Sequence, residues 1–197
     1  MMETHQSKRR RINNAPTTAF LLSLREKDAK EVANRCLTPL LETVVDTNDR
    51  LQAAGAQPPA RPSIFRLKKR PRVPLKTYLG RLVEATGCST KCLITALIYL
   101  DRVSAKEYPS TFTIHRLLLA SLLLADKHTG DGSGCKGWSY LTYAQAAGVP
   151  ESELKVLEVE MLRMLRYDLT VPPPQLLAYG TKIFQYKSLS VFRQESP

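Results

Sequence analysis

The sequence holds little that could support a disulfide-stabilised fold, a membrane span or an enzyme active site. It has only four cysteines and no CxxC pair, so neither a disulfide scaffold nor a metal site is expected. The longest apolar stretch, residues 117–125, is broken by Ser121 and is far shorter than the ~20 residues that a membrane-spanning helix needs. We therefore expect a soluble, reduced, intracellular protein.

Catalytic motifs are also missing. The chain has three histidines and contains no HExxH, no GxSxG and no ligand-spaced Cys/His set. A glycine-rich stretch at 130–137 lacks the Gly-Lys-Ser/Thr ending of a phosphate-binding loop and follows a predicted helix rather than a strand, which favours a plain flexible loop. We expect no enzyme activity, no cofactor and no metal, and the glycine-rich loop has no assigned role.

Acidic residues are scarce relative to basic ones, with 18 Asp and Glu against 29 Lys and Arg and a net charge of +11. The excess is local, because residues 61–91 contain nine basic residues and one acidic residue. Two basic runs stand in stretches without helical periodicity, which is typical of nuclear-import signals or of nonspecific anion binding. Import would place the protein in the nucleus as well as the cytoplasm. The candidate import residues are Lys8, Arg9, Arg10, Arg11, Lys68, Lys69 and Arg70.

The periodicity of apolar residues predicts an all-α protein, because they recur at spacings of three and four and strand-type alternation is nowhere sustained. Residues 1–27 form a basic tail predicted to be disordered. Residues 28–60 comprise an amphipathic helix, which Pro39 should kink or divide, and a Pro/Gly linker. That helix is too short to be stable alone and should pack against the rest of the chain.

Residues 61–170 are predicted to form a five-helix bundle, and residues 171–197 a short C-terminal helix and a tail. The third bundle helix is apolar nearly all the way round and therefore belongs at the centre. The predicted helices cover approximately residues 74–87, 89–103, 113–127, 140–147, 150–167 and 175–186.

Two charged residues fall on apolar helical faces. Glu158 lies within the apolar arc of the fifth bundle helix, and Lys127 lies on the face of Leu123 and Ala120 at the end of the third. A carboxylate so placed needs a partner. A structural ion pair or a helix-dipole effect explains both residues, and so does a binding site for another protein.

The order of helices and several motifs within them resemble the cyclin box of P/U-type cyclins, the single-box group related to the fungal phosphate-pathway cyclin. The motifs are Leu-Ile-Tyr-Leu-Asp-Arg at 97–102, Thr-Ile-His-Arg-Leu-Leu-Leu-Ala-Ser at 113–121, Ala-Asp-Lys at 125–127 and Leu-Glu-Val-Glu-Met-Leu-Arg-Met-Leu-Arg-Tyr-Asp-Leu at 157–169.

This resemblance implies a non-catalytic subunit that binds and activates a cyclin-dependent protein kinase in cell-cycle or nutrient (phosphate-type) signalling. In the family, the positions of Lys127 and Glu158 contact the kinase beside its movable regulatory helix, and here Ala120 and Leu123 would supply apolar contact. Asp101 would form a structural ion pair, with Lys76 or Arg81 as its base, because the arginine that many mitotic cyclins use is replaced by Leu75. The docking motif for Arg-x-Leu peptides is absent.

A helical nucleic-acid-binding domain is the alternative, since cyclin-box folds also occur in general transcription factors and the positive charge is concentrated at 61–91. Pro71 and Pro74 oppose it, because they prevent the basic run from forming a recognition helix.

Overall fold

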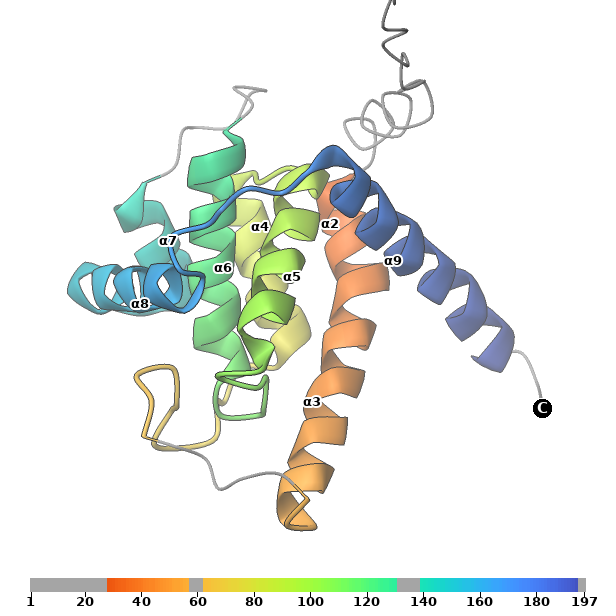
Figure 1. Cartoon of the computed structure of the whole chain (residues 1–197), viewed down its shortest axis with the longest axis horizontal. Coiled ribbons are helices and arrows are strands. Elements are labelled where there is room, and N and C mark those ends of the chain that lie inside the picture. Colours follow the sequence, from red (N-terminus) through yellow and green to blue (C-terminus); the bar gives the residue numbers. More distant parts are fainter. Residues whose placement is uncertain (1–27, 57–61, 131–138, 195–197) are drawn as a thin grey trace, which may run out of the picture.

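A computed structural model describes residues 28–56, 62–130 and 139–194, with side chains in the last stretch described as far as residue 185 (Figure 1). Every regular element within these residues is a helix, which confirms the predicted all-α class. The basic run at 8–11 and the glycine-rich loop beyond Gly130 lie outside the described residues. The five predicted bundle helices are α4 (Leu75–Thr86), α5 (Thr90–Ser104), α6 (Ile114–Thr129), α7 (Tyr140–Ala147) and α8 (Glu151–Met164).

Helix α6 is the centre of the bundle, as its all-round apolar sequence predicts. The side chains of residues 117–125 are all buried, and α6 packs against α4, α5, α7 and α8. Figure 1 shows α4, α5 and α6 side by side, with α7 and α8 on one flank and the N-terminal helices on the other. Because α6 is covered on every side, charged side chains on it are confined to its two ends.

The N-terminal segment is a helix divided by one π-helical turn. Helix α2 (Ala29–Val32) leads into the π-helical turn η1 (Ala33–Leu37), and α3 (Thr38–Ala53) follows. Pro39 has no N–H and stands in the first turn of α3, where no intrahelical donor is needed. The Thr38 hydroxyl donates to the Ala33 carbonyl at 2.9 Å. The segment is divided, as predicted, but the division lies at 33–37, directly before Pro39, which itself stands inside α3.

This segment packs against the bundle as part of the fold. Its inward side chains are buried, and η1 contacts α4 and the C-terminal helix. Farther along, the Asn48 amide donates to the Pro109 carbonyl at 2.8 Å, and the Thr111 hydroxyl donates to the Asp49 carboxylate at 2.5 Å. The buried residues are Val32, Ala33, Cys36, Leu37, Leu41 and Val45.

Two predicted helix ends were wrong. Helix α8 ends at Met164 rather than near Tyr167, because Arg166 and Tyr167 take left-handed φ values of 55° and 59°. The C-terminal helix α9 (Pro173–Gln194) is long, not short. Its prolines occupy its first turn, where they are tolerated, so they start this helix instead of delaying it.

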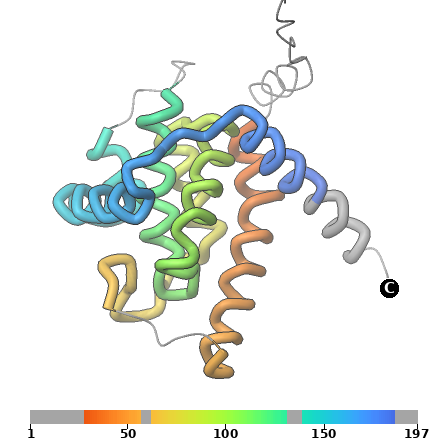
Figure 2. The backbone as a smooth tube through the Cα atoms, viewed as in Figure 1, coloured from red at the N-terminus to blue at the C-terminus, as the bar shows by residue number. Residues whose placement is uncertain are grey.

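Helix α9 supplies the partner of Asp101, which corrects the predicted ion pair. The Tyr179 hydroxyl donates to the Asp101 carboxylate, and among the described residues no cation lies within 4.0 Å of that carboxylate. The sequence prediction failed because it considered only bases on α4, whereas α9 crosses α5 beside Asp101. In Figure 2, α9 is the blue helix that runs next to the N-terminal helices.

The packing of η1 predicts that Leu37→Ala destabilises the protein. Leu37 is 1% exposed, so its truncation should lower the free energy of unfolding by about 2–5 kcal/mol. Leu51→Ala is the matched control, because Leu51 is 41% exposed and should cost little. Urea denaturation of both variants measures the difference. If Leu37→Ala lowered the free energy of unfolding as little as Leu51→Ala does, the N-terminal segment would not belong to the cooperatively folded unit.

Buried tyrosines predict a loss of stability at alkaline pH. Burial raises the pKa of Tyr78, Tyr99 and Tyr143, and burial with the hydrogen bond to Asp101 raises the pKa of Tyr179 to about 12. The unfolded chain ionises near a pKa of about 10, so this stability is complete below about pH 10 and is lost as the pH rises toward the folded values.

We therefore expect the free energy of unfolding to fall as the pH rises from about 10 to about 12. In an absorbance titration these four phenols should ionise only as circular dichroism reports unfolding. Ionisation of all eight tyrosines near pH 10 with the helix signal intact would contradict this expectation.

Candidate functional site

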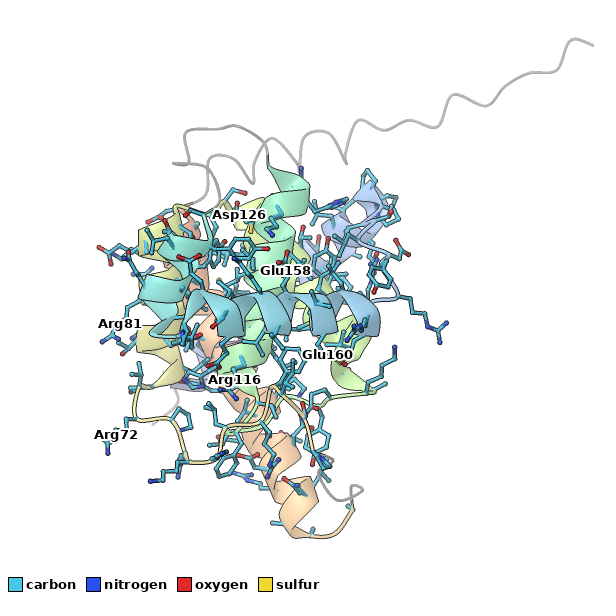
Figure 3. The ribbon with its side chains drawn as sticks, turned by 90° about the vertical axis from the view of Figure 1, so that its left-hand side faces the viewer. Arg72, Arg81, Arg116, Asp126, Glu158 and Glu160 are labelled. Carbon is cyan, nitrogen blue, oxygen red and sulfur yellow. The ribbon has the colours of Figure 1, made fainter. Side chains whose placement is uncertain are left out.

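The two charged residues singled out in the sequence meet where three helices converge. Lys127 lies in the last turn of α6, Glu158 lies in the middle of α8, and Tyr140 begins α7. Figure 3 shows α8 crossing α6 on this face, with Glu158 and Asp126 close to the crossing. Residues far apart in the chain therefore form one polar group.

The group is a closed triangle of hydrogen bonds. The Lys127 ammonium donates to Glu158 Oε1 at 2.5 Å and to the Tyr140 hydroxyl at 2.8 Å. The Tyr140 hydroxyl in turn donates to Glu158 Oε2. The Lys127 Nζ also lies 4.2 Å from the centroid of the Tyr140 ring, within cation–π range. Each carboxylate oxygen of Glu158 thus has its own donor.

Burial makes these contacts strong. The side chain of Glu158 is 9% exposed and that of Lys127 is 20% exposed. Burial by itself lowers the pKa of Lys127, but the hydrogen bonds to Glu158 and Tyr140 outweigh it, and the net pKa is raised. The lysine is therefore charged at neutral pH. A fifth of its side-chain surface remains exposed.

Tyr140 is a member of the site that sequence reasoning missed. The sequence analysis placed Tyr140 at the start of a short helix and assigned it no chemical role. The first turn of α7 is held to α6 by Tyr140, and one turn on Tyr143 donates to Asp126 Oδ2 at 3.0 Å. Tyr143 is buried, so α7 is fixed at the point where it meets the charged pair.

Ala120 and Leu123 do not line this surface, which corrects their predicted role as partner contacts. Both are 0% exposed, because α6 is covered on all sides and the face shared with Lys127 points into the core. They support the site from within. Exposed apolar side chains on these two helices are Leu141 on α7 and Val156 and Val159 on α8. Neighbouring residues of a helix point in different directions, so these side chains lie on other sides of α7 and α8 than Tyr140 and Glu158.

The remaining candidate residues fall elsewhere. Lys68, Lys69 and Arg70 are exposed on the segment before α4. Lys8, Arg9, Arg10 and Arg11 lie outside the described residues. Within the described ranges, no three His, Cys, Asp or Glu side chains are grouped as a metal site would require, and no helix has the length and apolar character to cross a membrane.

Comparisons with known proteins agree with this architecture. Residues 4–169 match the family model for cyclins. The chain is 33% identical over 147 residues to Cyclin-U4-1 of Arabidopsis thaliana, covering 73% of this chain and 70% of the relative. It is 33% identical over 148 residues to Cyclin-P4-1 of Oryza sativa subsp. japonica, covering 73% and 68%.

A fungal relative is more distant. The PHO85 cyclin-like protein psl1 of Schizosaccharomyces pombe is 28% identical over 127 residues, covering 62% of this chain and 51% of that protein. Cyclins are regulatory subunits rather than enzymes, in keeping with the absence of catalytic motifs from the sequence. With its five-helix box, added N-terminal helix and matched family model, this chain belongs to the cyclin family and is of the P/U type.

Proposed function

We propose that this cyclin binds a cyclin-dependent protein kinase through the surface around Lys127 and Glu158 and activates it. The observation that carries the proposal is the charged triangle of Lys127, Glu158 and Tyr140 at a surface where α6, α7 and α8 meet. Charge-assisted hydrogen bonds from such a group to a partner's backbone would fix its orientation.

Apolar contact would supply affinity beside this group. Leu141, Val156 and Val159 are 52%, 56% and 43% exposed, and they lie on the two helices that carry Tyr140 and Glu158. Val156 and Val159 are three residues apart and share one face of α8. Exposed apolar side chains on the helices that carry the charged group would add the apolar contact area that a binding surface needs.

Activation follows from preferential binding. A kinase alternates between inactive and active conformations, and the active one needs its Lys–Glu ion pair in place. A cyclin that contacts the active conformation better shifts this equilibrium by the difference in binding free energy. The tight packing of α6, α7 and α8 suits that role, because a rigid cyclin surface discriminates between the active and inactive conformations of the kinase. Cell-cycle and nutrient signalling are both compatible with this mechanism.

A double-mutant cycle tests the site. Lys127→Met and Glu158→Gln each leave a largely buried charge without its counter-charge and should lower the free energy of unfolding, by less than the ~3–5 kcal/mol of a fully buried pair. The double variant leaves neither charge uncompensated and should recover most of that stability. All three variants should bind the kinase more weakly, by more than ~1 kcal/mol.

The kinase is identified by mass spectrometry of proteins purified with the wild-type chain, and binding is measured by calorimetry. Lys30→Met with Glu84→Gln is the matched control, because it removes an exposed inter-helix pair at 3.4 Å, and binding should be unchanged. If the double variant recovered both stability and kinase binding, the Lys127–Glu158 pair would have a structural role only. Failure of any such kinase to co-purify would oppose the proposed function itself.

We also propose nuclear import through the two basic runs, 8–11 and 68–70. What supports it is composition together with the exposure of Lys68, Lys69 and Arg70. Fusion to a fluorescent protein should give nuclear signal in the wild type and cytoplasmic signal when both runs are changed to serine. Nuclear signal that persists in that variant would end the proposal.

A further inference from the structure

The segment at residues 62–74, before α4, carries positive charge that the fold leaves uncompensated. Lys68, Lys69, Arg70 and Arg72 are exposed, and residues 61–83 include no acidic residue. In the part of the chain that the structure describes, none of these four side chains has a carboxylate within 4.0 Å. The contacts proposed for the kinase use none of them.

The segment is nevertheless fixed to the bundle on its N-terminal side. Phe65 is 1% exposed and acts as its anchor. The Leu67 N–H donates to the Phe112 carbonyl at 2.8 Å, and the Arg66 guanidinium stacks 5.2 Å from the centroid of the Phe112 ring. On the other side, Leu75 is buried as α4 begins. The four exposed cations are therefore presented between two anchored points.

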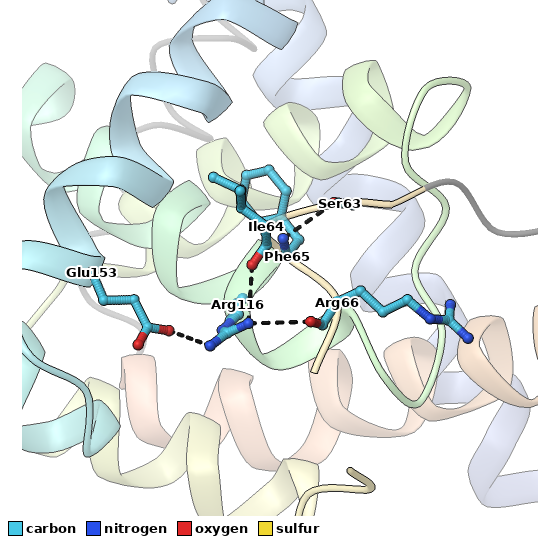
Figure 4. A network of polar contacts seen from close by, with 6 residues as sticks. All are labelled: Ser63, Ile64, Phe65, Arg66, Arg116 and Glu153. Carbon is cyan, nitrogen blue, oxygen red and sulfur yellow. Dashed lines mark hydrogen bonds and ion pairs between the residues drawn. The ribbon is translucent and has the colours of Figure 1, made fainter. Parts of the chain in front are cut away.

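Arg116 reinforces this shape from the core helix. Figure 4 shows its guanidinium between the loop and α8. Arg116 Nη1 donates to the carbonyls of Ile64 at 3.0 Å and Arg66 at 3.2 Å, and Nη2 pairs with Glu153 Oε1 at 2.5 Å. An arginine held by a carboxylate fixes two loop carbonyls at once. The loop needs little ordering before it binds something, which reduces the entropic cost of binding.

The surroundings restrict what the cations can bind. Arg70 and Arg72 border a hollow of about 320 Å³ whose wall includes Glu42 and Asp46 of α3. Duplex DNA presents a negative charge every ~1.7 Å, and its binding usually engages ~6–10 phosphates. Arg70 and Arg72 share this hollow with two carboxylates, whereas Lys68 and Lys69 do not border it, so the four cations suit a short run of negative charge better than a continuous phosphate backbone.

We propose that the loop Lys68–Arg72 is a docking surface for an acidic polypeptide segment of a partner protein. Asp and Glu side chains on a flexible segment can pair with the cations individually and avoid Glu42 and Asp46, which a rigid duplex cannot do. In Figure 3, Arg72 lies well away from Glu158. A partner can therefore occupy the loop without covering the Lys127–Glu158 surface. The proposed docking surface on the loop is separate from the proposed kinase contact and does not depend on it.

The test is direct binding to the purified full-length chain. A fluorescently labelled peptide of alternating glutamate and serine should bind, and a glycine–serine peptide of equal length should not, by anisotropy at about 0.1 M salt. Changing Lys68, Lys69, Arg70 and Arg72 together to Gln should weaken binding about tenfold or more. Circular dichroism melts establish that this variant is folded.

The matched control changes four exposed cations elsewhere, Arg50, Arg81, Arg166 and Lys182, to Gln, which should alter binding less than about twofold. Equal weakening by both variants would show that net charge alone attracts the peptide, and would overturn the proposal. Tighter binding of a DNA duplex than of the acidic peptide, lost in the loop variant, would also overturn it in favour of a nucleic-acid surface. None of these outcomes bears on whether a kinase co-purifies.

Discussion

The fold depends on the burial of α6 on every side. Its residues 117–125 face other helices in all directions, so α4, α5, α7 and α8 are arranged to cover it. Charged side chains on such a helix have room only at its ends, where Arg116 and Lys127 stand. Arg116 forms an ion pair with Glu153, and Lys127 forms one with Glu158, both on α8. The two ion pairs therefore fix how α8 crosses the core helix, and Figure 3 shows this crossing.

Each of these pairs also controls a surface. At the C-terminal end of α6, Lys127 and Glu158 are both hydrogen-bonded to Tyr140, so the start of α7 completes the charged triangle. At the N-terminal end, Arg116 uses Glu153 to orient itself and then holds the backbone of the basic loop through the carbonyls of Ile64 and Arg66. The burial of α6 thus leads to two chemically different surfaces, one at each end of this helix.

Under the proposed function, the Lys127–Glu158 pair would serve stability and binding with the same atoms. In the free chain its members satisfy each other and Tyr140, so neither charge is buried without a counter-charge. Its network of hydrogen bonds keeps the lysine charged and oriented. A partner that approaches this surface meets a group already arranged, rather than two flexible side chains that must first be ordered.

The sequence by itself determined the helical class, the central position of α6 and the division of the N-terminal helix near Pro39. It also singled out Lys127 and Glu158 as charged residues on apolar helical faces. These follow from local rules, because periodicity, proline chemistry and helical geometry act within one element. The tertiary structure decided which elements meet. It places Tyr140 in hydrogen-bonding contact with Lys127 and Glu158, brings Tyr179 of α9 to Asp101, and buries Ala120 and Leu123 in the core. No spacing along the chain encodes these outcomes, since each depends on the packing of helices far apart in sequence.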